Sequence, residues 1–211
     1  MNTKLTTVLL VLGMAFAIGC RSELDNKPAA LVSSAQAAEP AAQKLAPAAR
    51  VTAIAVDKSS IGWVGAKLTG DHKGGFNAWS GKVHRVGAQV NKVEFEVDTT
   101  SVFSDNEKLT GHLKSEDFFD VENHPKANFV SRRIEAKAGQ GSTHVVTGDL
   151  TLRGITRELS FPATIKTSAD QSLRASAEFT FNRLDFDIKY AGMPDDLIKK
   201  EVLLKLDFVA P

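Results

Sequence analysis

The chain has 211 residues, and its 26 basic and 25 acidic side chains leave a net charge of +1. Such a balance gives no electrostatic basis for binding nucleic acid, so we expect no nucleic-acid partner. The single cysteine excludes an internal disulfide, and the hydrophobic core must therefore hold the fold unaided.

Residues 1–19 have the features of a signal peptide. Lys4 precedes an apolar run that is shorter than the roughly 20 residues needed to span a bilayer as a helix. The run ends in Ala17-Ile18-Gly19-Cys20, which resembles a bacterial lipoprotein signal, in which the cysteine becomes the first mature residue and carries acyl chains. The resemblance predicts lipidation of Cys20 and an exported, periplasm-facing lipoprotein held at the membrane by its lipid anchor.

A second cleavage signal follows at Ala35-Gln36-Ala37, which has the A-x-A pattern. Cleavage there would discard Cys20 and leave a soluble periplasmic protein. Residues 20–50 are rich in Ala and Pro and show no sustained hydrophobic period, which predicts a flexible tether after Cys20. Residues 51–211 are long enough for one domain of ordinary size.

The domain consists mainly of predicted strands. Hydrophobic and polar residues alternate along 93–98, 175–181 and 202–208, which is the period of a half-buried strand. Glycine-containing or polar pairs, among them Gly74-Gly75 and Arg153-Gly154, indicate turns between strands. Further predicted strands are 52–57, 59–69, 76–87, 127–136, 143–153 and 156–167.

One segment, 104–120, breaks the strand pattern and predicts a short helix, capped by Ser104 or Asp105, and then a turn that docks Phe118 and Phe119 on the body. Many antiparallel strands with little helix leave two architectures, a sandwich or a closed barrel. A barrel of about eight strands can be filled by side chains or hold one small ligand. The 12 phenylalanines, several on inward rows, suit an apolar guest but equally suit a plain core.

Four motifs in order resemble the YceI-like family. They are WVGAK at 63–67, HLKSEDFFDVE at 112–122, GDLTLRGIT at 148–156 and NRLDFDIKY at 182–190. The resemblance implies a lipocalin-like antiparallel β-barrel with a long apolar cavity that binds a polyisoprenoid lipid; isoprenoid quinones belong to the same chemical class. Two positions depart from the family pattern: Asp187 stands where many members have glycine, and Lys58 where many have histidine.

Residues of the inward rows and of the motifs are the candidate walls of the cavity, with a filled core as the alternative for most of them. The candidate ligand-binding residues are Trp63, Phe76, Phe95, Val97, Phe118, Phe129, Leu150, Leu152, Phe161, Phe179, Phe181, Phe186 and Tyr190. Arg153 and Arg183 are candidates for a phosphate head group, which a guanidinium can bind bidentately. The alternative for both is an ion pair with Asp149 or Asp185.

The sequence gives no catalytic, metal or cofactor assignment. The five histidines have no metal-ligand spacing, and no nucleophile motif or glycine-rich phosphate loop occurs. His112 is expected to orient the helical segment by a hydrogen bond. We therefore expect a binding protein that sequesters or carries an isoprenoid in the cell envelope. The alternatives are a ligand-free structural or stress-response envelope protein, and a hydrolase or isomerase that uses His112 or His144.

Overall fold

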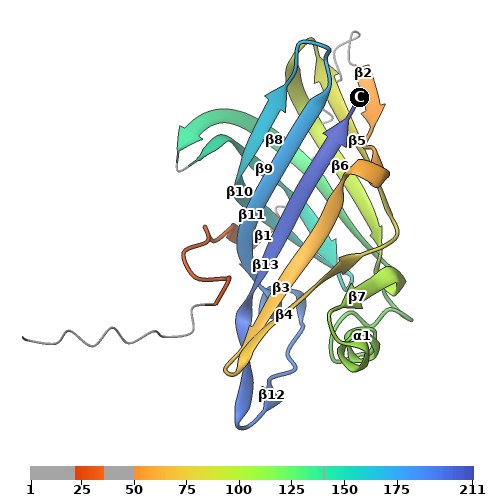
Figure 1. Ribbon diagram of the computed structural model, residues 1–211, viewed down its shortest axis with the longest axis vertical. Coiled ribbons are helices and arrows are strands. Elements are labelled where there is room, and N and C mark those ends of the chain that lie inside the picture. The colour runs from red at the N-terminus through yellow and green to blue at the C-terminus, as the bar shows by residue number, and fades with distance from the viewer. Residues whose placement is uncertain (1–21, 36–49, 140) are drawn as a thin grey trace, which may run out of the picture.

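The computed structural model describes residues 22–35, 50–139 and 141–211. The predicted signal peptide, Cys20 and the cleavage position after Ala37 lie outside the described residues. Among those residues, thirteen strands form one curled antiparallel sheet with a single α-helix (Figure 1). The all-β barrel class is thereby confirmed.

The sheet follows the order β2-β5-β6-β8-β9-β10-β11-β13-β3-β4-β7, with β1 paired to β10 and β12 paired to β13. The strands are β1 (Leu31–Ser34), β2 (Arg50–Ala53), β3 (Ser60–Lys67), β4 (Gly70–Phe76), β5 (Trp79–Val86), β6 (Gln89–Asp98), β7 (Val102–Ser104), β8 (Lys126–Gly139), β9 (Ser142–Leu152), β10 (Ile155–Thr167), β11 (Leu173–Asn182), β12 (Gly192–Met193) and β13 (Asp196–Ala210). The predicted number of about eight is wrong, because β1, β2, β7 and β12 are too short to show a period in the sequence.

The sheet curls where consecutive strands change their pairing partners: β4 pairs with β7, whereas β5 pairs with β6. Residues 77–78 join β4 to β5, and the 3-10 helix η2 (Thr99–Ser101) joins β6 to β7, so that Phe76 pairs with Val102 and Trp79 with Val97. At the opposite end, the amide of Ile54 donates to Gly81 of β5 at 2.9 Å and that of Ala55 to Val209 of β13 at 2.8 Å. The short 3-10 helix η1 (Val56–Lys58) follows this bridge and replaces the second half of the predicted strand 52–57.

The predicted alternation places the inward rows correctly. Phe95 and Val97 of β6, and Phe208 of β13, are buried inside the sheet. Between β10 and β11 the interior is tightly packed, with Phe161 stacked on Phe179 at a ring-centroid distance of 4.0 Å.

Strand β4 was not predicted, because Gly74-Gly75 has the composition of a turn. Gly74 lies within β4, opposite Trp63 of β3. A Cβ atom on Gly74 would lie 2.4 Å from the Trp63 ring and 2.0 Å from the carbonyl oxygen of Phe103. The glycine is therefore required by the close approach of an indole ring and a neighbouring strand, and it does not mark a turn.

The helical segment lies close to its predicted position. Helix α1 spans Glu107–Leu113, and its cap is Asn106, whose side chain accepts from the amide of Leu109, so the predicted Ser104 or Asp105 cap is wrong. The following turn docks Phe118 against the barrel as expected. Within the ranges that the structure describes, no helix has the length and apolar character needed to cross a bilayer.

Part of the predicted tether is ordered on the outside of the barrel. Residues 22–35, called here the N-terminal strap, end in β1, which pairs with β10 along 157–160. Leu24 is buried against Val64, Ala66 and Leu203 on the outer face of β3 and β13. These outward side chains are apolar because the strap covers them, which an Ala- and Pro-rich composition does not reveal.

Glu23 provides the main charged contact of the strap. Its carboxylate accepts from the ammonium groups of Lys205 and Lys73, the latter at 2.6 Å. These two lysines lower the pKa of Glu23 from its ordinary 4.5 to about 2. The contact therefore contributes its full stability above pH 4.5, and that contribution is lost as the pH falls through about 2.

We predict that Glu23→Gln lowers the free energy of unfolding by about 1 kcal/mol at pH 7, a value reduced for solvent screening of a partly exposed pair. Below about pH 2 the variant and the wild type should be equally stable, since Glu23 is then protonated in both. Denaturant titration at several pH values measures this. Glu122→Gln, at an exposed carboxylate, is the matched control; an equal loss for both variants would contradict the role of Glu23.

Candidate ligand-binding cavity

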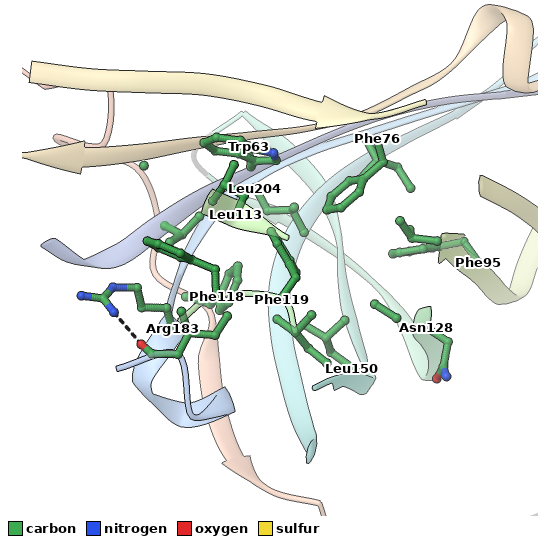
Figure 2. A pocket seen from close by; sticks show the side chains of 18 of the residues that line it. Trp63, Phe76, Phe95, Leu113, Phe118, Phe119, Asn128, Leu150, Arg183 and Leu204 are labelled. Atoms are coloured by element: carbon green, nitrogen blue, oxygen red, sulfur yellow. Dashed lines mark hydrogen bonds between the residues drawn. The ribbon is translucent and has the colours of Figure 1, made fainter. Parts of the chain in front are cut away.

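An apolar cavity of about 140 Å³ lies inside the barrel, beside the turn that follows α1 (Figure 2). Its walls come from β3, β4, β6, β8, β9, β11, β13 and the segments 113–119 and 183–188. The lining residues are Ile61, Trp63, Gly65, Phe76, Phe95, Val97, Leu113, Phe118, Phe119, Ala127, Asn128, Leu150, Leu152, Phe181, Arg183, Ile188, Ile198, Val202 and Leu204. We call this space the inner cavity; the surface it presents is entirely apolar.

The inner cavity brings together a majority of the predicted wall residues. Those that line it are Trp63, Phe76, Phe95, Val97, Phe118, Leu150, Leu152 and Phe181, together with Arg183. Tyr190, Phe129 and Phe161 line two adjoining spaces. Phe179 and Phe186 are almost fully buried and pack against Phe161 and Phe181, so they belong to the filled part of the core.

Two further spaces adjoin the inner cavity. The first, the mouth cavity, has a volume of about 220 Å³ and shares Trp63, Gly65 and Phe118 with the inner cavity. The second, the deep cavity, is only about 40 Å³ and is separated from the inner cavity by Phe95, which lines both. The three spaces therefore follow one another along the barrel interior.

The turn after α1 forms one wall of the inner cavity, and Arg153 holds it in place. Nη1 of Arg153 donates to the carbonyl oxygens of Glu116 and Phe118, at 2.6 Å each. Arg153 and Gly154 both have positive φ, 50° and 70°, as the two-residue hairpin between β9 and β10 requires. The predicted turn is thus confirmed, and Arg153 connects this hairpin to the turn after α1, which carries Phe118 and Phe119.

Arg183 lies at the edge of the inner cavity with its guanidinium turned away from the rings (Figure 2). Its three nitrogens donate to the backbone carbonyls of Ile188, Ile198 and Lys199. Burial lowers its pKa. Among the described residues neither Arg153 nor Arg183 forms an ion pair, since both guanidinium groups bind main-chain oxygens instead.

The backbone around Arg183 is irregular. The 3-10 helix η3 (Arg183–Phe186) ends at Asp187, whose φ of 60° is left-handed. Glycine adopts such a conformation without steric cost, whereas the Cβ atom of an aspartate disfavours it. In β13 the pairing register with β3 shifts between Ile198 and Val202, and this bulge frees the carbonyl groups that Arg183 binds.

The histidines do not face the inner cavity. Nε2 of His112 lies 2.7 Å from a carboxylate oxygen of Asp117, so it fixes the turn after α1 as expected. Nδ1 of His144 contacts the hydroxyl of its neighbour Thr143 at 2.7 Å. Within the described ranges, no cluster of three His, Cys, Asp or Glu side chains is placed to hold a metal ion.

Several wall residues were missed by sequence reasoning. Phe119 and Ile188 lie in irregular segments, where no period tells which side chain points inward, and Leu113 is the last residue of the short helix α1. Val202 and Leu204 belong to the alternating row of β13 and were identifiable from that row. Gly65 was not identifiable, because only its position opposite the Trp63 ring makes it part of the wall.

We predict that Arg183→Lys lowers the free energy of unfolding by about 2 kcal/mol, because one ammonium cannot satisfy carbonyl groups in three directions. Denaturant titration measures the loss. Arg174→Lys, at an exposed site on β11, is the control and should change little. Unchanged stability of Arg183→Lys would contradict the structural role of this guanidinium.

Comparisons with known proteins agree with this architecture. A family model described as the YceI-like domain matches residues 53–210. A UPF0312 protein of Shewanella denitrificans is 34% identical over 139 residues, covering 64% of this chain and 71% of that protein. A UPF0312 protein of Pseudomonas putida strain W619 is 30% identical over 119 residues, or 54% of this chain; the match spans only 61% of that protein's length.

Two solved structures share the fold. BcnA of Burkholderia cenocepacia gives a TM-score of 0.67 at 22% identity, covering 75% of this chain and 99% of that one. A polyisoprenoid binding domain from Saccharophagus degradans gives 0.59 at 14% identity, covering 77% and 97%. Because the family model covers well over half of the sequence, and the fold and motifs agree with it, the chain belongs to the YceI-like family.

Proposed function

We propose that this protein binds an isoprenoid lipid, either a polyisoprenoid or an isoprenoid quinone, with the lipid tail inside the barrel. The observation that carries the proposal is the apolar surface of the inner cavity. A chain of isoprene units offers no polar group along its length. Its transfer from water into such a space is favourable by about 25 cal/mol per Å² buried. The polyisoprenoid binding domain from Saccharophagus degradans, which shares this fold, supports the same ligand class.

The size of the cavities bears on how such a guest is held. A cavity of about 150 Å³ accommodates one benzene molecule, so the inner cavity alone holds only a short piece of an isoprenoid tail. The tail therefore occupies the mouth, inner and deep cavities in succession. Phe95, between the inner and deep cavities, must rotate to let a long tail pass.

The polar head group is best placed in the mouth cavity. Lys67, His72, Tyr190 and Asp196 line this space, whereas the inner cavity presents no polar surface. The guanidinium groups of Arg153 and Arg183 are engaged with backbone carbonyls, which favours a supporting role for them over direct binding of a head group.

The ligand-free alternative is favoured by one observation, the close stacking of Phe161 on Phe179, which fills part of the barrel. An enzymatic role has less support, because neither His112 nor His144 lines the inner cavity. Extraction of the purified protein with organic solvent distinguishes a lipid-binding protein, which releases a lipid, from a ligand-free structural protein, which does not.

We predict that an organic extract of the purified protein contains an isoprenoid detectable by mass spectrometry. In Gly65→Leu the lipid should fall to about a tenth or less, since a steric cost of only about 1.4 kcal/mol lowers affinity tenfold. The site tolerates a side chain, because a Cβ on Gly65 meets only the Trp63 ring, at 3.8 Å.

Gly139→Leu is the matched control, since a Cβ there meets nothing within 4 Å and the residue lies far along β8. It should retain the wild-type amount of lipid. An extract of the wild type without isoprenoid would favour the ligand-free alternative, as would equal amounts of lipid in both variants.

We also propose that the protein is exported and lipidated on Cys20, and that residues 22–35 stay with the mature chain. The strap supports this choice over cleavage after Ala37. Cleavage there would remove Leu24 from its buried site and β1 from its pairing with β10. The wild type should incorporate a clickable fatty acid in bacterial cells, and Cys20→Ala should not. An unlabelled mature protein that begins at residue 38 would contradict the proposal.

A further inference from the structure

One end of the barrel exposes large apolar side chains on two adjacent turns. Leu68 lies in the turn between β3 and β4 and is 67% exposed; Met193 of β12 is 61% exposed and Leu197 of β13 is 46% exposed. The amide of Leu68 donates to the carbonyl of Leu197 at 3.2 Å, so the two turns form one surface. Figure 1 shows them at the end opposite the C-terminus. We call these three residues the apolar tip.

The charges behind the apolar tip are largely neutralised within the protein. The ammonium of Lys67 pairs with Asp196, whose carboxylate also accepts from the amide and hydroxyl of Thr69. Asp195, in the two-residue turn between β12 and β13, is exposed and follows Met193 by two positions in the sequence. A surface of this kind favours an uncharged apolar medium over a charged partner, and Asp195 limits how deeply it can enter.

The apolar tip also borders the mouth cavity. Met193 and Asp196 line that cavity together with Tyr190, and the mouth cavity shares a wall with the inner cavity. A surface or solvent that contacts the apolar tip therefore also lies next to the mouth cavity, which leads to the apolar interior of the barrel.

The N-terminal strap begins beside the same end. The hydroxyl of Ser22 and the amide of Glu23 donate to Asp71 at 2.9 and 2.8 Å, and Asp71 follows Leu68 by three residues. Cys20 precedes Ser22 by two residues, which span at most about 7 Å. The proposed acyl anchor is consequently attached near the apolar tip and not at the far end of the barrel.

We propose that the apolar tip rests in the interfacial layer of a phospholipid bilayer, so that the mouth cavity opens at the membrane surface. A water-insoluble guest then enters the barrel without crossing water. This inference rests on the proposed function for its purpose, but its test does not depend on the identity of the lipid.

The test uses the full chain with Cys20→Ala, which leaves no other cysteine, in phosphatidylcholine vesicles. An environment-sensitive fluorophore is attached to Leu68→Cys, to Met193→Cys, or to the control Val51→Cys, an exposed position on β2 at the opposite end. We expect the probes at 68 and 193 to shift to the blue and to lose most of their emission to quencher groups on the lipid chains. The probe at 51 should do neither.

A charge added to the apolar tip distinguishes insertion of the tip into the bilayer from mere proximity of the tip to the vesicle surface. Leu68→Glu should abolish the quenching of the probe at 193, whereas Val51→Glu should leave it unchanged. Unquenched probes at 68 and 193 on vesicle-bound protein would overturn the inference, and so would equal quenching at 51. The lipid extract is read independently: a tip in the membrane without any extracted isoprenoid contradicts the proposed function alone, and the converse result contradicts this inference alone.

Discussion

A sheet that curls into a barrel has only its own inward side chains with which to fill its interior. This constraint determines the rest of the molecule. Rings from β10 and β11 pack tightly in one half of the barrel, where Phe161 lies on Phe179. In the other half Phe118 and Phe119, from a turn outside the sheet, join inward rings of the strands, and together they leave an open volume of about 140 Å³. The cavity is as apolar as a core because it is the part of the core that the inward rows do not fill.

That unfilled half depends on two arginines, the half-buried Arg153 and the buried Arg183, neither of which forms an ion pair with a carboxylate among the described residues. Arg153 holds the ring-bearing turn by its carbonyl groups, and Arg183 holds η3 against the bulge of β13. A guanidinium offers several donors in fixed directions, so one side chain can satisfy main-chain acceptors that no strand pairs. Irregular backbone can therefore line the cavity without leaving those carbonyl groups unsatisfied.

The sequence predicted the features that have a period and missed those that depend on contacts between distant segments. Alternation along β6, β11 and β13 was sufficient to place Phe95, Phe181 and Leu204 on the inside. Gly74 resembled a turn residue because its partner, the Trp63 ring, lies on another strand. Leu24 gave no signal within the strap, and the apolar outward residues Val64 and Leu203, which it covers, were not recognised as a contact surface. The arginines were identified by the family motifs, but their partners are carbonyl groups, which sequence composition does not reveal.

The position of Trp63 has an optical consequence. The chain contains two tryptophans, of which Trp63 lies in the wall shared by the inner and mouth cavities. The other, Trp79, lies against Phe208, with ring centroids 5.4 Å apart, and lines none of these three spaces. A guest that displaced the Trp63 ring would change one of two indole emissions, and a bound quinone would quench that emission through electron transfer. The protein thus carries a built-in spectroscopic reporter of the contents of its cavity, with Trp79 as the internal reference.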